Sequence, residues 1–123
     1  MVNVHMGVGI LVVIAFLALA VVNILRVTGK TIPWAKQLSY AAAGLLALQY
    51  VLGFTLLGNG HKITATHYLF ALAAIIPVGI EHSISKAREN EKPGSGLRIA
   101  AIASAVTTIL VIVAYSIGQS HGG

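Results

Sequence analysis

Two histidines, His5 and His67, each lie near the start of a long apolar stretch of the sequence. If both stretches form helices that run in the same direction, the two imidazoles lie at the same depth of the fold. Two neutral imidazoles on opposite sides of one iron atom, each at roughly 2 Å, ligate a six-coordinate heme. The chain contains no cysteine, which excludes thiolate metal sites and covalent c-type heme attachment. The pair therefore predicts a bis-histidine heme; the alternative is that each is an interfacial histidine.

The elements that must position these histidines are four apolar stretches in a chain that is 57% hydrophobic and only 9% charged. The stretches cover residues 4–26, 34–57, 64–85 and 97–118. At ~1.5 Å per residue, each helix is long enough to cross a ~30 Å hydrocarbon core. Short connections rich in glycine and proline make neighbouring helices antiparallel. We predict one all-α domain over residues 1–123, an integral membrane four-helix bundle with up-down-up-down topology.

The basic residues are distributed unevenly between the connections. Seven of the eight flank the first and third connections: Arg26, Lys30, Lys36, Lys86, Arg88, Lys92 and Arg98. By the positive-inside rule these connections are cytoplasmic and both termini are outside, as in a protein of a prokaryotic cytoplasmic membrane. The net charge of +5 is explained by attraction to lipid headgroups, and no nucleic acid is expected as a partner.

Polar and small residues recur at helical spacing and indicate which face of each helix points into the bundle. Gly9 shares the stripe of His5, and Ala71 shares the stripe of His67, so both are expected beside the heme, where small side chains leave room for a flat macrocycle. Ordinary packing of small residues between helices is the alternative explanation. Gln49 is the strongest marker of the inward face on the second helix. Lys62, with nearby threonine hydroxyls, is expected to meet the heme propionates.

A second polar group is expected at the cytoplasmic end, where Asn23, Glu81 and His82 point inward. Titratable groups inside a membrane are costly unless they are used, so this cluster is a candidate for binding a quinone headgroup or for proton transfer. The alternative is that Glu81 and His82 snorkel and close a helix end. His61 and His121 are expected in a loop and in the terminal tail.

The segment over residues 49–58, a short loop, and then His67-Tyr-Leu-Phe-Ala71 resemble a helix pair of the heme A synthase family. In that family a Gln-x-x-Leu-Gly helix leads into a helix that opens with a heme-ligand histidine. The helix that opens with His5 is similar to the preceding ligand helix. The family has two homologous four-helix halves, and this chain resembles the half that binds heme b, over roughly residues 4–80. The resemblance implies that His5 and His67 are the axial ligands of a b-type heme near the outer face.

The sequence also departs from that family. The catalytic half carries a glutamate shortly before its first histidine, whereas residues 1–4 contain no acid, and Met6 stands where an arginine follows the ligand. Enzyme activity is therefore uncertain, and a cytochrome-like electron carrier is favoured. The alternatives are a heme-free accessory subunit of a respiratory or photosynthetic complex and a half-length heme A synthase-like enzyme. So little loop surface favours partners in the membrane, either other copies of the chain or a larger complex.

Overall fold

The computed structural model describes residues 2–60, 62 and 64–120, and within these ranges the fold is all-α, without strands. Four helical rods, each long and apolar enough to cross a membrane, make up the molecule. Three are single helices, and the third, which we call the third span, consists of four shorter segments in line. The elements are α1 (Val2–Val27), α2 (Ala35–Gly58), the third span with α3 (Ala65–Ala73), α4 (Ile75–Gly79), the π-helix η1 (Ile80–Ile84) and α5 (Ser85–Glu91), and α6 (Ser95–Ser120).

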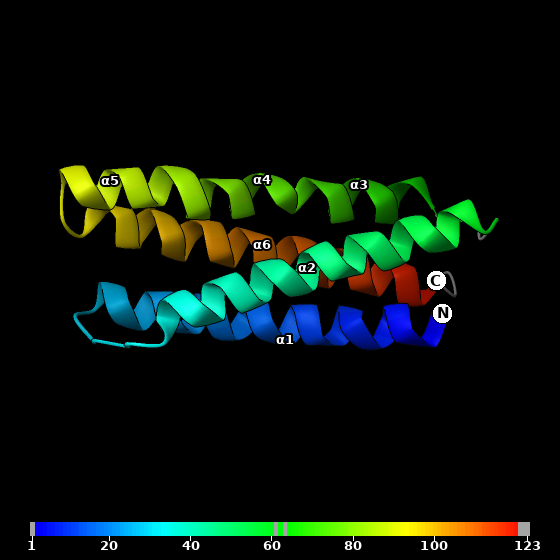
Figure 1. Ribbon diagram of the computed structural model, residues 1–123, viewed down its shortest axis with the longest axis horizontal. Helices are drawn as coiled ribbons and strands as arrows, with labels where there is room; N and C mark the ends of the chain where they lie inside the picture. Colours follow the sequence, from blue (N-terminus) through cyan, green and yellow to red (C-terminus); the bar gives the residue numbers. More distant parts are fainter. Residues whose placement is uncertain (1, 61, 63, 121–123) are drawn as a thin grey trace.

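The four rods run alternately up and down, as predicted (Figure 1). Both ends of the described chain and the connection between α2 and α3 lie at one end of the bundle, which we call the terminal end. The α1–α2 and α5–α6 connections lie at the other end, which we call the basic end because seven of the eight Lys and Arg residues flank them. Which end faces the cytoplasm remains a prediction from this charge asymmetry.

The helix ends follow from local backbone chemistry. Each of the three turns contains a glycine in the left-handed region, with φ of +101° at Gly29, +88° at Gly60 and +91° at Gly94. Glycine adopts this conformation without steric cost, so it ends helices efficiently. The sequence predicted that the third helix would end at residue 85, but it continues to Glu91. The charged residues 86–91 end the apolar part of the span and not the helix, which stops only at the turn containing Gly94.

Packing is closest between α1 and its two neighbours, α2 and α6, and between the third span and α6. The centre is filled by apolar side chains from all four rods: Val12, Phe16, Leu19, Ala42, Leu46, Ala74 and Val111. Among the described residues, the backbones of α2 and the third span make no comparably close contact. Side chains bridge this side instead: the Tyr50 hydroxyl donates to the Ala71 carbonyl at 2.6 Å, and the rings of Phe54 and Tyr68 lie 6.2 Å apart.

Replacing Tyr50 with phenylalanine tests this bridge. The change removes one hydrogen bond and leaves the Ala71 carbonyl without this donor, so we expect the free energy of unfolding to fall by about 1 kcal/mol. Unfolding by sodium dodecyl sulfate in mixed micelles measures the change. Tyr68→Phe, which keeps the ring that contacts Phe54, is the matched control. Equal stability of the Tyr50→Phe variant and the unmodified protein would show that the bridge contributes nothing.

The third span is irregular around Pro77. The helix is interrupted at Ala74, between α3 and α4. Pro77 has no backbone N–H, so the carbonyl of Ala73, four residues earlier, lacks its usual helical hydrogen bond. Pro77 therefore accounts for the interruption. The π-helix that follows was not predicted. Such turns are rare and are frequently found at functional sites.

Candidate functional site

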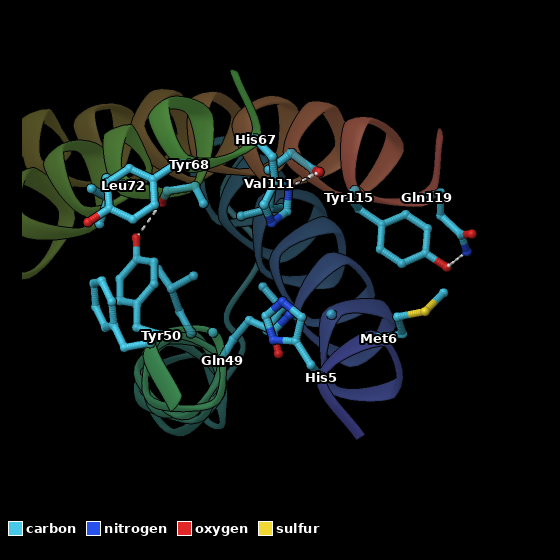
Figure 2. A pocket seen from close by; sticks show the side chains of 18 residues that line it. His5, Met6, Gln49, Tyr50, His67, Tyr68, Leu72, Val111, Tyr115 and Gln119 are labelled. Carbon is cyan, nitrogen blue, oxygen red and sulfur yellow. Dashed lines mark hydrogen bonds between the residues drawn. The ribbon is translucent and has the colours of Figure 1, made fainter. Parts of the chain in front are cut away.

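A cavity of about 90 Å³ lies inside the terminal end of the bundle, between His5 and His67 (Figure 2). His5 comes from the first turn of α1 and His67 from the first turn of α3. All four rods contribute to the lining, which is mostly apolar. Besides the two histidines, the residues that matter below are Met6, Gly9, Gln49, Tyr50, Gly53, Tyr68, Ala71, Leu72, Ala114, Tyr115 and Gln119.

The two imidazole rings face each other across the cavity. Their centroids are 6.4 Å apart and their planes are nearly perpendicular, at 82°. Two iron–nitrogen bonds of ~2 Å, with about 1 Å from each nitrogen to its ring centre, place the rings of a bis-histidine heme roughly 6 Å apart. The observed separation of 6.4 Å is therefore compatible with one iron atom between the two rings. The expectation that both side chains reach the same depth agrees with this geometry.

Hydrogen bonds to the backbone and to the ring of His67 fix its orientation. The backbone N–H of His67 donates to the Thr64 hydroxyl, which caps the start of α3. On the ring, Nδ1 lies 2.6 Å from the carbonyl oxygen of Ala114 in α6. A carbonyl only accepts, so Nδ1 carries the proton and Nε2 keeps its lone pair. A metal-ligating histidine usually has this arrangement, in which the second ring nitrogen donates to a carbonyl.

His5 is buried and packed directly against the α2 backbone. A Cβ atom on Gly53 would lie 3.3 Å from Cε1 of the ring, so only glycine lets α2 approach so closely without pressing on the imidazole. Among the described residues, neither Nδ1 of His5 nor Oε1 of Gln49 has a hydrogen-bond partner, although both atoms are buried. Buried polar atoms without partners are rare, and they often mark a functional site or an absent bound group.

The cavity extends to both sides of the histidine pair (Figure 2). Tyr50, Tyr68 and Leu72 lie on one side. Met6, Tyr115 and Gln119 lie on the other, where the Gln119 amide donates to the Tyr115 hydroxyl at 2.7 Å. A porphyrin is larger than the cavity, so it fits only if side chains along these two edges turn outward. The two histidines can stay where they are.

The remaining residues predicted for this site divide into two groups. Gly9 and Ala71 both line the cavity, and a Cβ atom on Gly9 would lie 3.1 Å from Nε2 of Gln49. Lys62 is exposed and does not line it, and the Thr64 hydroxyl is engaged in the helix cap. A propionate contact with Lys62 therefore remains a prediction. Sequence reasoning did not single out Gln119, which faces the cavity from the last turn of α6.

The polar residues predicted for the other end of the bundle form a cluster around Ser39. The Ser39 hydroxyl lies 2.7 Å from Oε2 of Glu81 and 3.2 Å from Nε2 of His82. Asn23 turns toward α6, where its amide donates to the Ser104 hydroxyl at 3.1 Å. Sequence reasoning missed Ser39, although it lies three residues before Ala42 on the inward stripe of α2. Asn23, Glu81 and His82 line neither the cavity between His5 and His67 nor the apolar groove between the third span and α6.

His61 and His121 lie outside the described residues. The resemblance to the heme A synthase family remains a prediction from the sequence. Comparison with protein-family models, with curated proteins and with solved structures finds no match to this chain, so its own residues carry the functional argument.

Proposed function

We propose that this protein is a membrane b-type cytochrome-like electron carrier that holds one heme between His5 and His67 at the terminal end. The observation that supports it most is the 6.4 Å separation of the two imidazole centroids. The hydrogen bond from His67 to Ala114 adds to it, because it leaves the other ring nitrogen available to a metal.

Each side chain has a distinct role in this proposal. The Ala114 carbonyl and the Thr64 cap orient His67, and Gly53 lets α2 hold His5 in place. The apolar lining keeps water from the site, and Gly9 and Ala71 provide space beside the macrocycle. If its amide moved toward His5, Oε1 of Gln49 would accept a hydrogen bond from Nδ1–H of that ring, which would satisfy both unpartnered atoms. The heme iron, when bound, supplies a one-electron couple.

Electron transfer is favoured over catalysis by the composition of the site. With a heme held by His5 and His67, both histidines would be iron ligands and no open position would remain for a substrate. None of the lining residues is a carboxylate, and all three acidic residues of the chain, Glu81, Glu89 and Glu91, belong to the other end of the bundle. An acid that could assist oxidation of a heme methyl group is therefore absent from the lining.

The partners that we propose are in the membrane. Large apolar side chains are exposed along all four rods, as expected of surfaces that contact lipid or other membrane subunits. We place both termini outside, in a prokaryotic cytoplasmic membrane, on the basis of the charge asymmetry. Further copies of the chain or a larger membrane complex would surround the bundle, and a quinone is the proposed partner for electron exchange.

The direct test is an absorption spectrum of the protein purified in detergent, reduced with dithionite minus oxidised, with pyridine hemochrome quantification. We expect b-type bands and one heme per chain. Colourless protein, even after heme supplementation during expression, would contradict the proposal. If that protein migrates with larger partners, the heme-free accessory subunit is correct instead. A change in cellular heme A content on deletion of the gene would favour the enzyme.

Gly53 offers a graded test of the same site. Valine at this position would push its methyl groups into the His5 ring, which already lies 3.3 Å from the Cβ position. We expect heme affinity to fall about tenfold, the equivalent of a modest overpacking cost. Heme titration of the apoprotein measures the affinity. Gly44→Val, in the same helix and with no atom near its Cβ position, is the control and should bind heme normally.

A further inference from the structure

The polar cluster at the basic end centres on the carboxyl group of Glu81. This side chain is only 7% exposed, although it lies in a membrane-spanning segment. Its Oε2 atom accepts a hydrogen bond from Ser39, and its buried Oε1 atom has no partner. A carboxylate that snorkelled to close a helix end would be solvated, so the burial argues against that alternative. A buried ionisable group in a membrane is expensive and is by default a functional candidate.

The hydrogen bonds around Ser39 have a defined direction. The hydroxyl has one proton, which it donates to Glu81 at 2.7 Å. Its lone pairs therefore face Nε2 of His82 at 3.2 Å, so that nitrogen must carry a proton and donate it. The result is a continuous chain from the His82 imidazole through the Ser39 hydroxyl to the Glu81 carboxyl group.

The outer member of this chain is accessible from the basic end. His82 is half-buried, and its ring lies 5.3 Å from that of the exposed Tyr40. The ammonium group of Lys36 lies 5.9 Å from the centre of the same Tyr40 ring. Lys36 flanks the α1–α2 connection, so the imidazole is placed between the surface at the basic end and the buried carboxyl group.

The surroundings of Glu81 stabilise both of its protonation states. Asn23 and the guanidinium group of Arg26, both on α1, favour the charged form of the carboxyl group. Arg26 is itself held by a hydrogen bond to Asn23 at 3.4 Å. From α2, Ser39 donates to the carboxylate, and on its own helix His82 is the neighbouring titratable group. Among the described residues the buried Oε1 atom of Glu81 has no hydrogen-bond partner, so the charge of the carboxylate is only partly compensated and the group can gain a proton. Glu81 and His82 both belong to the π-helix η1.

We propose that His82, Ser39 and Glu81 form a proton relay that loads a proton from the basic end onto Glu81, a role independent of the heme. The His82 imidazolium gives its Nε2 proton to Oγ of Ser39 while the Ser39 proton passes to Oε2 of Glu81. The neutral imidazole keeps its Nδ1 proton, turns toward the basic end and takes a proton at Nε2 from a hydronium ion, which leaves as water. Reversal of the same steps discharges Glu81, and no electron is exchanged.

Infrared spectroscopy can observe this relay because the chain has only three acidic side chains, all glutamates. Of these only Glu81 is buried. In protein with ¹³C-labelled glutamate, we expect a carboxylic acid C=O band of a buried group that appears as the pH falls and is lost in Glu81→Gln. After a rapid drop in pH, Ser39→Ala and His82→Phe should slow the appearance of this band about tenfold, because each breaks the hydrogen-bonded chain.

The matched control is Ser83→Ala, which removes an exposed hydroxyl from the same segment and should leave the rate unchanged. If Glu81→Gln does not fold, Glu89→Gln and Glu91→Gln in the labelled protein remove the other two acids in turn, and a buried band that both variants keep is assigned to Glu81 by elimination. The proposal is overturned if no buried carboxyl band titrates, or if both relay variants load the proton at the normal rate. Neither measurement uses a heme signal, so the result is separate from that of the cytochrome proposal.

Discussion

Replacement of either His5 or His67 with alanine is expected to abolish the reduced-minus-oxidised heme spectrum of the purified protein. In the proposed site each imidazole would supply one of the two iron ligands, and no other histidine among the described residues lines the cavity. The loss should be nearly complete for His67→Ala, since the ring is fixed by Ala114 and its position cannot be taken by a neighbour. In His5→Ala, removal of the imidazole ring leaves an empty space of the same size beside Gly53.

Two controls separate ligation from folding. His82→Ala removes a histidine that does not line the cavity and should keep a full complement of heme. Imidazole added to the alanine variants should enter the vacated space and restore part of the low-spin spectrum, which a misfolded chain would not show. An unchanged spectrum in either alanine variant would contradict the proposal that this histidine is an axial ligand.

Gly96→Ala is expected to be the most destabilising small substitution in the chain. A Cβ atom at Gly96 would lie 2.3 Å from the carbonyl oxygen of Ser85 and 2.8 Å from the backbone nitrogen of Glu89. These are backbone atoms, so they cannot move aside as a flexible side chain would. We expect a loss of about 3 kcal/mol in the free energy of unfolding, at the upper end of overpacking effects.

The contacts around Gly96 explain why the backbones are so close. The Ser85 hydroxyl donates to the Gly96 carbonyl at 2.8 Å, and the Glu89 carboxylate accepts from the backbone N–H groups of Gly94 and Leu97 at 3.0 and 3.1 Å. The carboxylate thus satisfies donors at the start of α6 that have no partner within the helix. Separating α5 from α6 would break all of these bonds together.

Denaturation in mixed micelles measures the effect of Gly96→Ala, with Gly79→Ala as the control. Gly79 is also helical, and no atom lies within 4 Å of its Cβ position. The control should be neutral or slightly stabilising, because alanine favours helix more than glycine does. A Gly96→Ala variant as stable as the control would mean that α5 and α6 are not in contact at this point.

The coarse fold was predictable because its signals are local. The length and apolarity of each stretch indicate a membrane span, and glycine marks the turns between them. On the first helix His5, Gly9 and Asn23 were predicted to face inward, and all three residues are buried.

The rest depends on contacts between helices, which periodicity does not encode. Nothing local showed that the Ala114 carbonyl would orient His67, or that Asn23 would turn to Ser104 in α6. The π-helix at Ile80–Ile84 was missed because its sequence has no distinguishing residue besides the preceding proline. The close approach of Gly96 to Ser85 was missed for a related reason, since a glycine next to a turn was interpreted as part of the turn.

The close packing of α1 on α6 sets the order in which the molecule can be completed during synthesis. These two helices are separated by most of the chain, yet they pack closely against each other. While the ribosome is still producing the first three rods, α1 has only α2 beside it, and His67 has no Ala114 carbonyl to hold its ring. The histidine pair therefore becomes rigid only when α6 enters the membrane. If the proposed heme were inserted earlier, it would meet an incomplete site in which the His67 ring is not yet oriented.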